Sequence, residues 1–117
     1  MQQDYGGGSV LKPRTQRFPI QVPLEYRVTG EAGWNEGTTI NISRSGVLFR
    51  SVKEIEPATP VSMKILFPAN LTGGSGVNLM CWGHIVRSEP AEPIRALAAT
   101  IDHSRLKRTK RPIKPNR

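Results

Sequence analysis

Two short stretches carry the side chains that could do chemistry in this sequence. In one, Asn41 and Ser43 supply short polar groups, and Gly46 lets the backbone approach closely or take a positive φ. In the other, Arg14 and Arg17 lead directly into a regularly patterned segment. Guanidinium groups bind phosphate bidentately, read the O6 and N7 edge of guanine and stack on its ring. The two stretches together suit a guanine nucleotide, but a solvated basic segment and an ordinary hairpin turn also explain them.

Residues typical of enzyme active sites are sparse. The histidines are His84 and His103, and the single cysteine is Cys81. His84 and Cys81 fall in one expected strand, where a structural role for the histidine and a buried one for the cysteine are favoured over catalysis. The spacings typical of metal ligands and of phosphate-binding loops are missing from the sequence. The sequence therefore predicts a non-enzymatic protein that needs no metal or cofactor.

The formal net charge of +8 is concentrated at one end of the chain. Residues 105–117 hold seven of the 17 basic side chains and none of the nine acidic ones, whereas residues 1–104 carry a net charge of only +1. This basic end has no apolar stripe and two late prolines, so we expect a mostly disordered tail.

Alternation of apolar and polar residues predicts short strands. The clearest alternation covers residues 18–29 and predicts that Phe18 and Tyr26 belong to the core. Ile40 and Ile42 are expected to share one face of the next strand. Five further runs, separated by turn residues, predict strands near residues 38–43, 47–52, 61–67, 77–87 and 94–101.

These runs predict one all-β domain, because we find no amphipathic helix before residue 102. The expected architecture is a six-stranded antiparallel β-barrel over residues 12–103, since closure protects strand edges in so small a chain. A flexible N-terminus (1–11) and the basic tail (104–117) flank it. The sequence has no run of about 20 apolar residues and no secretory signal at its start, so we expect a cytoplasmic location.

The order of these features resembles the PilZ domain, the bacterial receptor module for cyclic di-GMP, over residues 12–103. An arginine segment precedes an alternating strand, a turn and NISRSGVLFR, and then come a proline-flanked strand, WGHIVRSE and LAATID. The family's second motif is Asp or Asn, any residue, Ser, two residues and Gly. Asn41, Ser43 and Gly46 match it in full.

The family's first motif is matched in part. It has two arginines separated by three residues, and Arg17 fits the second of them. Pro13 stands at the position of the first, and Arg14 lies one residue too close. A flexible arm could still bring Arg14 to the same place.

The resemblance implies a receptor or adaptor whose ligand is cyclic di-GMP, often as a stacked, intercalated dimer. Arg14 and Arg17 would clamp phosphate and guanine, while Asn41 and Ser43 would meet a guanine edge. The arm would fold over the ligand and change what the N-terminal region contacts, including a downstream protein partner.

Two alternatives remain open at this stage. The chain could be a degenerate PilZ-like module that contacts proteins without binding the dinucleotide, or a small basic barrel that binds nucleic acid. The tail could be a solubilising end, or could contact nucleic acid, an anionic membrane or an acidic protein. It could also supplement the incomplete arginine motif at the ligand phosphates.

Overall fold

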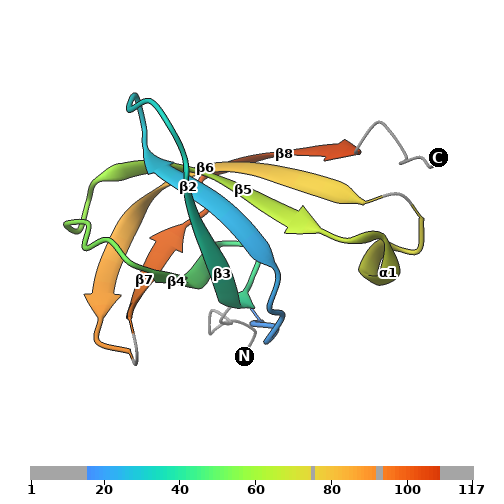
Figure 1. The fold of residues 1–117 in the computed structure, drawn as a ribbon, viewed down its shortest axis with the longest axis horizontal. Helices are drawn as coiled ribbons and strands as arrows, with labels where there is room; N and C mark the ends of the chain where they lie inside the picture. Colours follow the sequence, from blue (N-terminus) through green and yellow to red (C-terminus); the bar gives the residue numbers. More distant parts are fainter. Residues whose placement is uncertain (1–15, 75, 92–93, 109–117) are drawn as a thin grey trace, which may run out of the picture.

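The computed structural model describes residues 16–74, 76–91 and 94–108 (Figure 1). Seven strands and one short helix make up this part of the chain. They are β2 (Pro23–Val28), β3 (Asn35–Ile42), β4 (Gly46–Ser51), β5 (Pro60–Phe67), α1 (Ala69–Thr72), β6 (Val77–Glu89), β7 (Arg95–Thr100) and β8 (His103–Arg108).

Six of the strands close into a barrel. The strand order is β5-β2-β3-β4-β7-β6, every neighbouring pair is antiparallel, and β5 also pairs with β6. Closure leaves these six strands without an open edge along most of their length. The prediction of an all-β, six-stranded antiparallel barrel is confirmed, and β8 is an additional strand outside it.

The barrel interior is apolar and follows the predicted alternation. On β5, Val61, Met63 and Ile65 are fully buried. The rings of Tyr26 and Phe49 pack at a centroid distance of 4.9 Å in the same core. Burial of these side chains supplies the main driving force for a domain of this size.

The first predicted strand is interrupted. The sequence predicts one strand over residues 18–29, but regular pairing begins only at β2, and residues 19–22 are not in a strand. The Thr39 hydroxyl bonds this segment instead: its oxygen accepts from the Val22 N–H (2.8 Å), and its O–H donates to the Ile20 carbonyl (2.6 Å). Pro19 lacks an N–H and cannot donate to a ladder. The segment is therefore anchored along β3 without being a strand.

A bulge in β3 changes which side chains face the core. The pairing of β3 with β4 shifts register between Thr39 and Asn41. Thr39 is only 1% exposed, and Ile42 packs against the core cluster, whereas Ile40 is outside that cluster. The expectation that Ile40 and Ile42 share a face is wrong, because a bulge adds one residue and breaks the period of two.

The prediction that the chain is disordered from residue 104 is wrong for residues 104–108. They belong to β8, which pairs with β6 from Val77 to Trp82. β6 is 13 residues long, so its first half extends past the point where β7 stops pairing, and β8 fills that open side. The Asp102 N–H donates to the Trp82 carbonyl (2.8 Å) where β7 ends and β8 begins. The rest of the predicted tail, and the predicted flexible N-terminus, lie outside the described residues.

Gly83 allows β6 and the end of β7 to approach closely. A Cβ atom at this position would overlap the carbonyl oxygen of Thr100. We expect Gly83→Ala to lower the free energy of unfolding by about 1–3 kcal/mol, because backbone atoms must move to make room. Urea denaturation measures this change. Gly74→Ala is the matched control, since a Cβ there meets nothing within 4 Å, and an equal loss in both variants would contradict the steric explanation.

Candidate functional site

The segment of residues 16–22, which we call the leader, carries Arg17. The structure brings this arginine and the Asn-Ser-Gly stretch together at one end of the barrel. The Nη1 atom of Arg17 donates to Oδ1 of Asn41 at 2.8 Å, across 24 positions of sequence. The contact is exposed to solvent. Figure 1 shows the leader passing the end of β3 where the turn to β4 begins.

An isolated backbone bridge holds Arg17 in this position. The Phe18 N–H donates to the Ile42 carbonyl (2.8 Å), and the Ile42 N–H donates to the Phe18 carbonyl (2.9 Å). The bridge is antiparallel, so Arg17 stands opposite Ser43 and diagonally from Asn41 on the same face, where its long side chain reaches the Asn41 amide. We call this end of the barrel, with Arg17, Asn41 and the turn through Gly46, the rim. The expectation that Phe18 belongs to the core is wrong, since it is 47% exposed at the rim.

Ser43 builds the turn between β3 and β4. It is only 5% exposed, and its Oγ accepts from the N–H groups of Gly46 (3.1 Å) and Ser45 (3.3 Å). Its own N–H donates to the Gly46 carbonyl (2.8 Å). Its hydroxyl is therefore engaged within the turn, which fixes the backbone that follows Asn41.

Gly46 is required for close approach and not for a positive φ. Among the described residues, the positive φ values belong to Ala58 and three other glycines. A Cβ at Gly46 would lie 3.0 Å from the carbonyl oxygen of Ala99 on β7, tighter than ordinary packing allows. The glycine therefore brings the turn close to β7, where the Ile101 N–H donates to the Ser45 carbonyl (2.8 Å).

The site is electropositive. Arg17 and Arg44 are both exposed, and among the described residues neither has a carboxylate within 4.0 Å. Arg44 lies between Ser43 and Ser45 in the turn. It was not among the predicted site residues, although its position inside the matched motif could have indicated it. Arg14, the other predicted site residue, lies outside the described residues.

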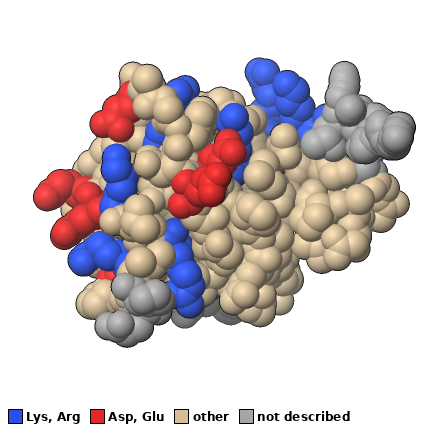
Figure 2. All heavy atoms as spheres, in the orientation of Figure 1, with Lys and Arg blue, Asp and Glu red and all other residues tan. Residues whose placement is uncertain are grey.

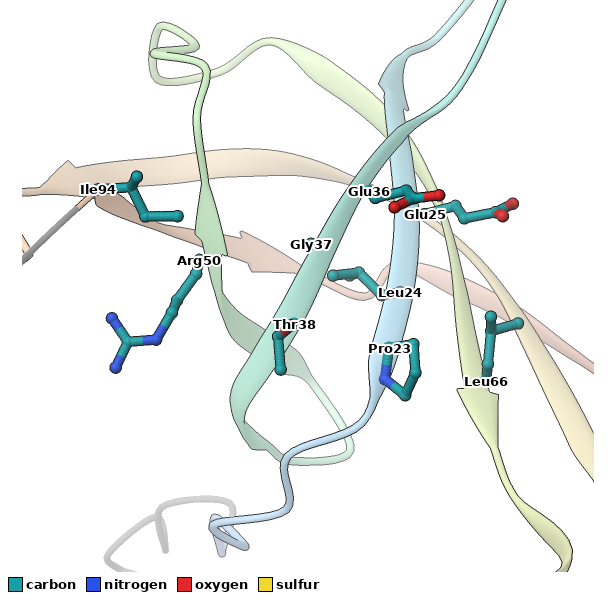
Figure 3. A pocket seen from close by; sticks show the side chains of 9 residues that line it. All are labelled: Pro23, Leu24, Glu25, Glu36, Gly37, Thr38, Arg50, Leu66 and Ile94. Carbon is teal, nitrogen blue, oxygen red and sulfur yellow. The ribbon is translucent and has the colours of Figure 1, made fainter.

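A separate hollow of about 460 Å³ on the outside of the barrel does not suit an anion. Glu25 and Glu36 stand directly opposite each other on β2 and β3 and line it. Figure 3 shows their side chains close together, while Arg50 extends on the other side of Gly37. Two carboxylates at the mouth would repel phosphate, so the rim with Arg17 and Asn41 is the better candidate.

The environments of Cys81 and His84 indicate structural roles. Burial raises the pKa of the Cys81 thiol to about 12, so the thiolate is scarce at neutral pH. His84 Nδ1 lies 3.2 Å from both Asp102 Oδ2 and Thr100 Oγ1, and this contact ties β6 to the end of β7. Within residues 16–74, 76–91 and 94–108, no three His, Cys, Asp or Glu side chains gather as metal ligands would. The helix in this part of the chain is too short to span a bilayer.

The fold and the site define a small antiparallel β-barrel with an arginine leader at an Asn-Ser-Gly turn. The sequence matches the PilZ domain model over residues 12–103, so the chain belongs to the PilZ domain family. None of the curated proteins gives a significant match.

A solved structure supports the fold. The structure of the Bacillus subtilis inhibitor of motility, MotI/DgrA, superimposes with a TM-score of 0.65 at 10% sequence identity. The similarity covers 80% of this chain and 44% of that protein, so this chain spans less than half of its length. At this identity the likeness concerns the fold alone.

The site residues differ in what they contribute to stability. We expect Ser43→Ala to lower the free energy of unfolding by about 1–3 kcal/mol, because buried N–H groups in the turn lose their acceptor. Arg17→Ala should change it by less than about 0.5 kcal/mol, since its hydrogen bond is exposed. Thermal or urea unfolding measures both, with Ser104→Ala on exposed β8 as a control. A larger loss for Arg17→Ala than for Ser43→Ala would contradict these assignments.

Proposed function

We propose that this chain is a cyclic di-GMP receptor that works as a non-enzymatic adaptor. The observation that carries the proposal is the 2.8 Å hydrogen bond between Arg17 and Asn41 at the rim of the barrel. It joins the one arginine that fits the family's first motif to the first residue of its second motif. We expect this receptor to act in the cytoplasm.

The chemistry of the rim suits this ligand. The Arg17 guanidinium has further N–H donors besides the one given to Asn41, and these can bind a phosphate or the O6 and N7 edge of guanine. The Asn41 amide can donate and accept at a guanine edge. Ser43 contributes by fixing the turn, so its role is that of a positioning residue and not of a direct ligand contact.

Ordering of the leader is the response that we expect to ligand binding. Arg14 precedes Arg17 in the sequence, and we propose that both clamp the dinucleotide, singly or as a stacked dimer. Arg44 adds a third positive charge at the turn. Ligand binding would order the leader over the rim and change the surface offered to a downstream protein. Such coupling requires no chemical reaction.

Titration calorimetry with cyclic di-GMP tests the proposal. We expect Arg17→Ala and Asn41→Ala each to weaken binding by about 10- to 100-fold, the cost of losing a charge-assisted or paired hydrogen bond at the ligand. Arg87→Ala is the matched control, because Arg87 pairs with Glu89 on β6 and should leave the affinity unchanged.

Two outcomes would contradict the proposal. One is the absence of heat from the wild-type chain at a ligand concentration of about 100 μM. The other is wild-type affinity in both rim variants, which would move the ligand elsewhere. The first result would leave the chain as a family member that acts through protein contacts alone, and the second would reject the rim as the binding site.

A further inference from the structure

A second polar surface lies on the strands that extend beyond the barrel. Met80 on β6 stands directly between Lys64 on β5 and Arg105 on β8. Lys64 follows the buried Met63, so its side chain points outward, as do those of its cross-strand neighbours. We call this surface the wing face and define it by six residues, Lys64, Asn78, Met80, Trp82, Arg105 and Lys107.

The wing face is hollowed. These six residues line a depression of about 360 Å³, which is the lower end of the range for ligand sites. Trp82 is 37% exposed, although most tryptophans of a small domain are largely buried. The hollow therefore combines an accessible aromatic ring, an amide and three cations.

The positive charge of this face is largely uncompensated. In the part of the chain that the structure describes, neither Arg105 nor Lys107 has a carboxylate within 4.0 Å. Lys64 lies 3.5 Å from Glu25, and its Nζ is 4.4 Å from the centre of the Trp34 ring. Figure 2 shows Lys and Arg gathered over β8 with no acidic side chain beside them in this view. Four more basic residues follow in the sequence, at positions 110, 111, 114 and 117.

We propose that the wing face binds single-stranded nucleic acid. A base stacks on Trp82, Arg105 and Lys107 contact successive phosphates, and the Asn78 amide meets a base edge. Alternate residues of one strand point to the same side, so β8 presents its two cations as a row along the edge of the hollow. A row of charges beside an aromatic ring suits a polymer of nucleotides better than a single one.

Other occupants fit less well. A second copy of the chain would bring the cations of two β8 strands together, which is unfavourable. A membrane surface would favour apolar side chains protruding among the cations. The wing face offers only Met80 and Trp82, whereas Leu106, the apolar residue of β8, stands opposite Leu79 on its other face. The wing face shares no residue with the rim, since its six residues lie on β5, β6 and β8. The inference therefore does not rest on the dinucleotide proposal.

Fluorescence anisotropy with labelled oligonucleotides of about 15 deoxythymidines or uridines tests the inference. We expect binding of the full chain at about 50 mM salt, with affinity falling steeply as salt rises. Trp82→Ala should weaken binding by about 5- to 150-fold, the loss of one stacked base, while Trp82→Phe keeps most of the affinity. Circular dichroism and thermal unfolding identify any variant that fails to fold.

Lys107 and Arg108 form a matched pair for the charges. They are neighbours on β8 with equal charge, but Lys107 stands opposite Asn78 on the wing face and Arg108 opposite Val77 on the other face. Lys107→Ala should weaken binding several-fold and reduce the slope of log affinity against log salt by about 0.7. Arg108→Ala should leave the affinity and the salt slope closer to those of the wild-type chain.

Three results would overturn the inference. The first is no binding of either oligonucleotide at low salt. The second is equal losses for Lys107→Ala and Arg108→Ala with no effect of Trp82→Ala, which would indicate diffuse attraction by the basic end. The third is that the chain binds phosphatidylserine vesicles, loses this binding on Trp82→Ala, and does not bind the oligonucleotides.

Discussion

The arrangement of the rim depends on two backbone hydrogen bonds between Phe18 and Ile42. They form an isolated bridge that attaches the segment around Arg17 to the end of β3, beyond the contacts that Thr39 makes with Ile20 and Val22. They fix the backbone next to both Arg17 and Asn41, which lie 24 residues apart in sequence. Backbone pairing thus converts two distant polar groups into one site.

The second constraint is the length of β6. Its second half closes the barrel against β7, while its first half continues beyond and carries β8 (Figure 1). The molecule therefore has two separate polar regions, the rim at the β3–β4 turn and the wing face outside the barrel.

Much of this could be predicted from sequence, for identifiable reasons. Regular alternation on β5, with Val61, Met63 and Ile65 inward, predicted a strand correctly, the turn residues between runs indicated antiparallel strands, and the need to protect strand edges in a small chain favoured closure. The bulge in β3 could not be predicted, because only the pairing partner determines which of Thr39 and Ile40 faces inward. β8 was missed because Leu106 is its one apolar residue, so its sequence shows no alternation, and it pairs along the open side of β6. At the rim, the sequence selected Ser43 as a ligand contact; the structure shows that it is buried and hydrogen-bonded within the turn, and the positioning role is our proposal.

The most direct test of the central claim is the set of backbone and side-chain amide chemical shifts in an ¹⁵N-labelled sample titrated with cyclic di-GMP. We predict that the shifts of Arg17, Phe18, Asn41 and the turn through Gly46 change together and saturate, while those of Asn78 and Lys107 stay close to their starting values. Changes confined to β6 and β8, or no changes at all, would contradict the claim that the leader and the Asn-Ser-Gly turn form one dinucleotide site.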